Sequence, residues 1–255
     1  MGVIERPEMS IGLASFIGAI TVITAFLTGI FGMAGGLLLM GVLVVILPVP
    51  DAMILHGITQ TSSNGSRIVM MRQYVSWPIA LRFGLGGAVS VAAMSMILFV
   101  PDKGVVLICI GLLPFLSLSV PAHIVPRVDR GTGAVWCGTS CMVLSLTAGV
   151  AGTLLDLFFV RSELDRRQVV ATKAACNTIL HLTKTAYFGA IVGIAGTSLP
   201  GWLLLMALGL PLIGNWLARP VLNRMNNDQF RLWTRVLVLL IGVVYLTQGA
   251  IHYLA

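Results

Sequence analysis

Two polar segments of an otherwise apolar chain carry the side chains best suited to chemistry. In residues 52–74, four such side chains recur at spacings of 4, 4 and 3: His56, Gln60, Asn64 and Arg67. In residues 166–188, the same spacings separate Lys173, Asn177, His181 and Lys184. On an α-helix these intervals place each set along one face. The pattern predicts two polar faces that meet at a shared site.

The cations on these faces have no carboxylate on the same face to neutralise them. A buried cation costs about 2.5–3.5 kcal/mol on membrane-insertion scales, so such a residue tends to face a cavity or a partner. An anionic ligand would neutralise Arg67, Lys173 and Lys184. The alternative is that Lys173 lies near the membrane interface and that Lys184 snorkels from its helix end. Arg67, well inside its segment, favours the ligand-binding interpretation.

Three further residues are candidates for proton coupling. A histidine side chain ordinarily titrates near neutral pH, so His56 and His181 could carry coupled protons, although a lone histidine is more often a hydrogen-bonded core residue. Asp156 interrupts an apolar run, and it lies five residues before Arg161, with which it could instead pair near the interface. Both interpretations stay open for each residue.

Two glycine clusters form the second feature. Gly29-Ile30-Phe31-Gly32-Met33-Ala34-Gly35-Gly36 lies in the first half, and Ala148-Gly149-Val150-Ala151-Gly152-Thr153 lies in the second. Such clusters either let helices pack closely or break a helix so that backbone N–H groups face an anion.

The cysteine pair Cys137 and Cys141, one helical turn apart, lacks nearby histidine or carboxylate and is interpreted as core. The sequence predicts no metal site and no cofactor.

Composition identifies the elements that must position these residues. Of 255 residues 57% are hydrophobic and 10% are charged, with a mean hydropathy of +0.97. Long runs lack any charge: 9–50, 83–101, 104–122, 131–155, 185–218 and 236–255. Since about 20 apolar residues cross a bilayer, we predict an all-α polytopic membrane protein with about 8–10 membrane segments. A disordered chain, a soluble enzyme and a disulfide scaffold are excluded. The net charge of +7 sits in short connectors and does not indicate nucleic-acid binding.

The arginines indicate the topology. If 9–50 and 131–160 each enter and return on the same side, nearly all basic residues fall on one side, which the positive-inside rule makes cytoplasmic. Those residues are Arg72, Arg82, Arg127, Arg130, Arg161, Arg166, Arg167, Arg219, Arg224, Arg231 and Arg235. Arg6 and Lys103 fall on the other side, together with both termini. The connector 121–130 is then cytoplasmic.

This topology predicts two inverted repeats, residues 1–120 and 131–255, joined by the connector 121–130. An internal match at an offset of 113 supports it, because Thr59, Asn64 and Tyr74 align with Thr172, Asn177 and Tyr187. Inverted repeats with interrupted helices at matching positions are typical of secondary transporters with a site at the membrane midplane.

The glycine-rich entry Gly29–Gly36, the proline at Pro48 and the polar helix after it resemble the sulfite exporter TauE/SafE family, also called the toluene-sulfonate uptake permease (TSUP) family. Gly149-Val150-Ala151-Gly152 and the helix with Lys173, Asn177, Lys184 and Tyr187 recur where that family's second half has them. The resemblance covers essentially the whole chain.

The resemblance implies transport of sulfite, sulfoacetate or taurine-like acids across a bacterial inner membrane, with export as the expected direction. Arg67 and Lys184 would be charge partners of the anion, and Asn64, Asn177 and Thr59 hydrogen-bond donors. The remaining expected binding residues are Gly35, Gly36, Gly152, Lys173 and Tyr187. The expected partners are a small anion and the lipid bilayer, with no nucleic acid, and a homodimer is left open.

Other classes are left open beside this one. The chain could carry another small organic or inorganic anion, or act as a non-transporting subunit that recruits a partner through its basic loops. A membrane-embedded hydrolase would need a nucleophile with a positioned base, for which only Ser140 or Ser145 with His181 is available. We predict that the chain is not an enzyme.

Overall fold

The computed structural model of the chain describes residues 10–192, 197, 199–225 and 227–254, and in these residues it has helices and no strand. The α-helices are α1 (Ile11–Phe31), α2 (Met33–Ile46), α3 (Val49–Met71), α4 (Trp77–Met96), α5 (Lys103–Ser119), α6 (Gly133–Ala148), α7 (Gly152–Phe159), α8 (Arg166–Val192), α9 (Gly201–Arg224) and α10 (Asn227–Leu254). Two short 3-10 helices, η1 (Arg72–Tyr74) and η2 (Ala122–Ile124), lie in connectors.

Length and apolarity fit a membrane protein. Within the described residues, four helical segments are long and apolar enough to cross a bilayer: Ile11–Phe31, Trp77–Met96, Gly201–Val221 and Leu232–Leu254. A helix satisfies its own backbone hydrogen bonds, which a bilayer core requires because it offers no water. Large apolar side chains such as Leu85, Val89 and Leu240 point outward. The prediction of an all-α polytopic membrane protein is confirmed.

Both glycine clusters break a helix. Gly32 ends α1 at φ +68°, where its N–H donates to the Thr28 carbonyl oxygen at 2.9 Å. Gly149 ends α6 at φ +77°, where its N–H donates to the Ser145 carbonyl oxygen at 2.9 Å. Glycine adopts positive φ without the steric cost that a Cβ imposes. Each predicted glycine-broken stretch is therefore two helices joined by a tight turn.

The second broken stretch returns to the end at which it began. The Val128 N–H, before α6, donates to the Phe158 carbonyl oxygen of α7 at 3.2 Å. Glu163, after α7, forms ion pairs with Arg127 at 3.0 Å and Arg130 at 2.5 Å. Of the two interpretations of 131–160, the structure has the hairpin and not a kinked single span.

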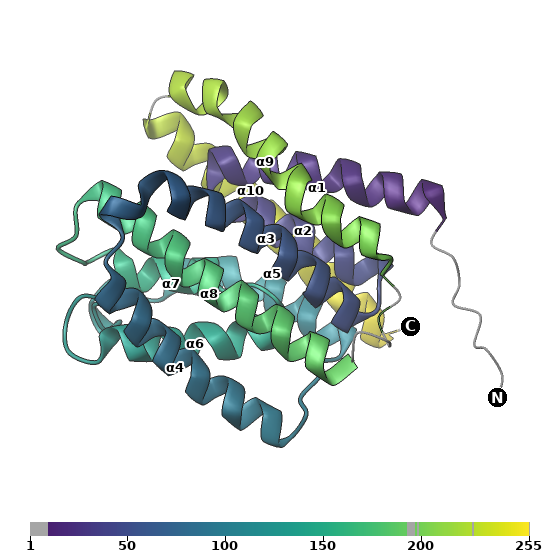
Figure 1. Ribbon diagram of the computed structural model, residues 1–255, viewed down its shortest axis with the longest axis horizontal. Coiled ribbons are helices and arrows are strands. Elements are labelled where there is room, and N and C mark those ends of the chain that lie inside the picture. The colour runs from purple at the N-terminus through teal and green to yellow at the C-terminus, as the bar shows by residue number, and fades with distance from the viewer. Residues whose placement is uncertain (1–9, 193–196, 198, 226, 255) are drawn as a thin grey trace.

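The polar helices α3 and α8 run antiparallel through the middle of the bundle. Gly57 of α3 lies against Thr185 and the His181 carbonyl of α8. Beyond the C-terminal end of α3, in η1, the Tyr74 hydroxyl accepts from Arg167 of α8 at 2.9 Å. Figure 1 shows α1 and α9 on one side of this pair and α4 and α6 on the other. α1 packs on α9 and α4 packs on α6, and each pair joins a helix of the first half to one of the second. The orientation of the halves as inverted repeats, and the boundaries 1–120, 121–130 and 131–255, stay predictions.

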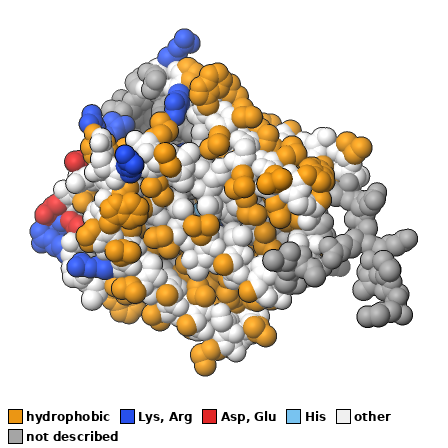
Figure 2. Space-filling view, in the orientation of Figure 1, with side chains coloured by type: hydrophobic (Ala, Val, Ile, Leu, Met, Phe, Trp, Pro, Cys, Tyr) orange, Lys and Arg blue, Asp and Glu red, His pale blue; other side chains and the backbone are white. Residues whose placement is uncertain are grey.

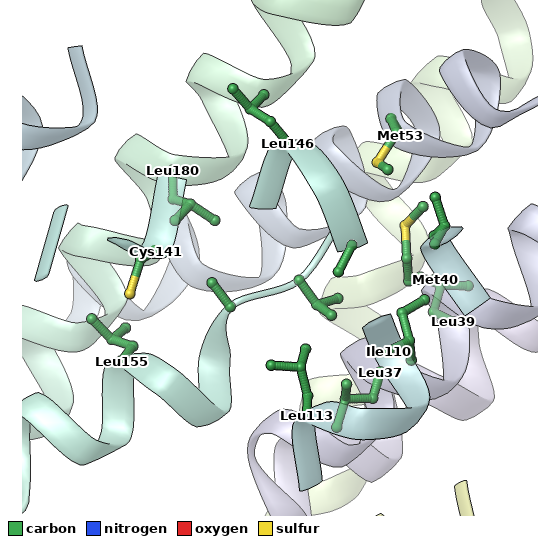
Figure 3. Packing of buried hydrophobic residues seen from close by; sticks show 14 of the residues in the cluster. Leu37, Leu39, Met40, Met53, Ile110, Leu113, Cys141, Leu146, Leu155 and Leu180 are labelled. Atoms are coloured by element: carbon green, nitrogen blue, oxygen red, sulfur yellow. The ribbon is translucent and has the colours of Figure 1, made fainter. Parts of the chain in front are cut away.

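The apolar core surrounds α2. This helix is apolar all round and short, as expected for a helix enclosed by others. In Figure 3 its Leu39 and Met40 lie beside Ile110 of α5, and Leu146 and Leu155 extend the same cluster into α6 and α7. This core holds the two broken hairpins together.

Basic side chains gather at one end of the bundle. Arg161 donates to the His123 carbonyl oxygen at 3.0 Å, and Arg219 contacts the Met70 sulfur at 3.1 Å. Connectors from both halves therefore meet there. Figure 2 shows Lys and Arg over this end, with hydrophobic side chains over the rest of the visible face. The asymmetry accords with the positive-inside count, whereas the membrane side that this end faces stays a prediction.

Candidate functional site

A cavity of about 530 Å³ lies where the two broken hairpins meet the two polar helices. The turn between α1 and α2 and the turn between α6 and α7 form part of its wall, including Gly32, Gly36, Ala151 and Gly152. Most of the polar side chains in the wall come from α3, α7 and α8: His56, Gln60, Asn64 and Arg67 of α3, Asp156 of α7, and Lys173, Asn177 and His181 of α8. The two predicted polar faces thus line one cavity.

Arg67 is the cation of this cavity without a carboxylate partner in the described part of the chain. Its guanidinium donates to the carbonyl oxygen of Thr28 at 3.3 Å, in the last turn of α1. That carbonyl belongs to the negative end of the helix dipole, which favours a cation. A guanidinium has five N–H donors in a planar fork suited to oxyanions. Most of this capacity remains for a ligand in the cavity.

Lys173 and Asp156 form an ion pair across the cavity wall, from α8 to α7. Both side chains keep about a third of their surface exposed, at 29% and 34%. Of the two interpretations left open for Asp156, pairing with Arg161 is not what the structure has. The Arg161 guanidinium donates instead to the carbonyls of Ala122 and His123.

Lys184 is wholly buried behind the cavity and does not snorkel. Its Nζ donates to the Gly149 carbonyl oxygen at 2.7 Å and contacts His56 Nδ1 at 2.9 Å. His56 Nε2 lies 3.1 Å from the carbonyl oxygen of Gly36. A carbonyl only accepts, so Nε2 carries the hydrogen and Nδ1 accepts from Lys184. A chain of hydrogen bonds therefore links the turn after α6 to α2.

His181 lines the cavity and has a buried ring nitrogen that is unpaired within the described residues. Its ring packs edge-on against His56, with centroids 5.3 Å apart. Its Nδ1 is buried and has no hydrogen-bond partner among the described residues. Asn64 nearby donates from Nδ2 to the Gln60 carbonyl oxygen at 2.9 Å. His181 and Asn177 both line the cavity, where a ligand would contact them.

Besides Lys184, three residues expected in the site do not line this cavity. Thr59 donates back to the Leu55 carbonyl oxygen at 2.8 Å within its own helix. Tyr187 donates to the carbonyl oxygens of Met94 and Phe99, which ties α8 to the end of α4. Gly35 lies against the backbone of α1, where a Cβ would overlap the Thr24 carbonyl. Gly35 therefore serves close helix packing.

A family model described as sulfite exporter TauE/SafE matches residues 17–245. The chain belongs to the TauE/SafE family. No curated protein and no solved structure matches it. The TauE/SafE family consists of membrane transporters of the anion-exporter type and not of enzymes, in line with the sequence prediction. The serines considered for a hydrolase, Ser140 and Ser145, do not line the cavity with His181.

Some groups that form this TauE/SafE site were not predicted from the sequence. The carbonyl oxygens of Thr28 and Gly149 hold Arg67 and Lys184, and a backbone acceptor leaves no trace in residue type. Gln60 stood on the predicted polar face but was not chosen, although its spacing of four from His56 and from Asn64 indicated it. Thr234 of α10 also reaches the cavity from a helix with no polar pattern of its own.

Proposed function

We propose that this TauE/SafE protein carries a small sulfur oxyanion or an organosulfonate across the inner membrane of a bacterium, with export as the direction. Arg67 carries the proposal, as a cavity-lining cation whose hydrogen bond in the described residues goes to a backbone carbonyl. An oxyanion bound there would satisfy the remaining guanidinium donors and neutralise the charge.

Alternating access would come from movement of the two broken hairpins relative to each other. The hydrogen bonds from Gly149 through Lys184 and His56 to Gly36 join one hairpin to the other next to the cavity. A change at this link would alter the relative position of the two turns. Transporters with interrupted helices at a central site commonly work by rocking of one half against the other.

Proton coupling would act through His56 at the same link. His56 accepts from Lys184 through Nδ1 only while that nitrogen is unprotonated. A proton on Nδ1 would remove this hydrogen bond and place two cations side by side. His181, packed on His56 with a free Nδ1, offers the route from the cavity, and Asp156 lies on the cavity wall.

The test is anion flux in proteoliposomes of purified protein, loaded with sulfite or a small sulfonate, with and without an imposed pH gradient. We expect saturable, pH-linked flux that Arg67→Ala abolishes. Arg82→Ala is the matched control, because Arg82 is exposed at the start of α4 and does not line the cavity. Wild-type flux in folded Arg67→Ala would contradict the site. Absence of flux for every sulfur oxyanion would favour another anion, and then a partner-recruiting subunit.

A further inference from the structure

The charged side chains that line the cavity leave one positive charge uncompensated. Arg67 contributes a cation without a carboxylate partner in the described residues, whereas Lys173 is paired with Asp156. Lys184 does not line the cavity, and its Nζ contacts His56, which does. The cavity wall formed by the described residues therefore carries Arg67 and one internally neutralised pair.

We propose that the Asp156–Lys173 ion pair sets the charge selectivity of the cavity, so that it accepts a singly charged anion in preference to a doubly charged one. This inference rests on the proposed function and adds the charge of the substrate. A sulfonate or hydrogensulfite carries one negative charge, and sulfate or fully ionised sulfite carries two. Arg67 alone neutralises the former but leaves the latter with an excess charge.

Electrostatics within a protein makes this difference large. An unneutralised charge removed from water loses hydration that the cavity must replace. A single unit charge a few ångströms away, at the effective dielectric of a protein, changes affinity by more than tenfold. Asp156 supplies such a charge directly on the wall. Its charge cancels that of Lys173, which would otherwise attract a second negative charge.

The position of the pair suits this role. Asp156 lies one turn into α7, which begins at Gly152, and Lys173 lies one turn before Asn177 on α8. Both side chains are partly exposed to the cavity. An anion at Arg67 therefore shares one compartment with the pair. The pair is placed to contact the substrate as well as to join two helices.

The test compares two sulfonates of similar build whose charge does not change with pH, ethanesulfonate with one charge and ethanedisulfonate with two. Each is used to compete with labelled ethanesulfonate for uptake into proteoliposomes. The ratio of the two half-inhibitory concentrations measures charge selectivity, independently of the amount of active protein. We expect the wild type to favour the monoanion.

The variants alter the wall charge step by step. Asp156→Asn frees Lys173 and should shift the ratio at least tenfold toward the dianion. Lys173→Gln leaves Asp156 facing Arg67 and should weaken inhibition by both anions, the dianion more. Asp156→Asn combined with Lys173→Gln restores one positive charge and should return the ratio to that of the wild type. Asp156→Glu, which keeps the charge, is the control.

The outcomes separate the two proposals. An unchanged ratio in an Asp156→Asn protein that still transports ethanesulfonate would overturn the inference and leave the proposed function intact. A shift that persists in the double variant would also overturn it, since packing and not charge would then be the cause. If the folded wild type moves neither sulfonate nor any sulfur oxyanion, the proposed function fails and the inference falls with it.

Discussion

Lys184 and Arg67 are both cations within membrane helices, yet their surroundings give them different tasks. Arg67 faces the cavity and donates to one backbone carbonyl at its edge. Lys184 is enclosed, and its ammonium group serves Gly149 and His56. The sequence analysis predicted that both residues are charge partners of the anion. We propose Arg67 for that task and Lys184 for joining the two halves, since Arg67 lines the cavity and Lys184 does not.

Replacement of Lys184 should therefore cost stability as well as flux. Lys184→Met leaves the Gly149 carbonyl and His56 Nδ1 without their donor, and a buried polar group left unpaired costs about 1–3 kcal/mol. We expect a lower melting temperature in detergent by intrinsic fluorescence. Lys103→Met is the control, because that half-buried lysine also donates to a carbonyl, that of Val45, at 2.8 Å. Equal melting temperatures for the two variants would contradict the role of Lys184.

Residue types and spacing reveal only part of this site. The 4, 4, 3 spacing placed His56, Asn64 and Arg67 on one face without any knowledge of tertiary structure, because helical geometry alone determines it. The pairing of Asp156 with Lys173 depends on how α7 folds back onto α8, and no local pattern encodes that. The near neighbour Arg161 was an equally good partner on sequence distance.

At the scale of elements, the two broken hairpins depend on glycine. Gly32 and Gly149 both adopt positive φ, and the turns that they make form part of the cavity wall or adjoin it. The sequence shows the glycine clusters but does not decide their role, because close helix packing and helix breaking both favour glycine. The structure assigns breaking to Gly32 and Gly149 and packing to Gly35. Backbone conformation, which residue type does not determine for glycine, makes the difference.

Gly149→Ala should disrupt its turn. A residue with a Cβ pays about 1–2 kcal/mol for the left-handed conformation, and the added carbon would overlap the side chain of Met40. We expect a loss of monodisperse protein in size-exclusion chromatography and a lower melting temperature. Gly189→Ala in α8, where a Cβ meets open space, should be neutral or stabilising by up to about 1 kcal/mol. A stable Gly149→Ala protein would show that the turn tolerates a side chain.

The connector between α5 and α6 is held by an ion-pair network outside the membrane-spanning helices. Arg127 contacts Asp129 at 2.7 Å and lowers the pKa of the Asp129 carboxyl to about 2. Asp129 also accepts from the Glu163 N–H at 2.9 Å. A carboxyl with a lowered pKa contributes stability above its unfolded value and loses it as the pH falls toward the folded value.

This network predicts a specific pH dependence of hydrogen exchange. Protection of the Glu163 amide should stay constant from neutral pH to about 4 and fall as the pH approaches 2, after correction for intrinsic exchange. Asp129→Asn should lose that protection already at neutral pH, while amides in the middle of α3 stay protected. Full protection in Asp129→Asn would show that the network does not hold the connector.

At the scale of the whole molecule, the basic connectors of both halves share one end of the bundle, and the start of α1 and the end of α10 lie at the other (Figure 1). Single-sequence counting anticipated this asymmetry, because charge in short connectors follows topology. The lateral order of the helices, with α1 on α9 and α4 on α6, could not be anticipated. Apolar faces toward lipid and toward protein look alike in composition.

The sidedness of this arrangement can be tested in intact cells. In a Cys109→Ala background, Ile97→Cys should react with a membrane-impermeant maleimide from outside, and Arg130→Cys should react only after lysis. Ile97 and Arg130 are both exposed, at opposite ends of the bundle. The remaining cysteines are buried. The reverse labelling pattern would place the basic end outside.

Because α2 and α7 are short, they affect where the membrane voltage falls within the protein. At about 1.5 Å per residue they measure roughly 21 and 12 Å, less than the hydrocarbon core of about 30 Å. Water that enters the cavity between them would carry the potential of one compartment deep into the protein. The membrane voltage, worth about 2.3 kcal/mol per charge at 100 mV, would then fall across a thin layer next to His56 and His181, and that layer is where a moving anion would do its electrical work.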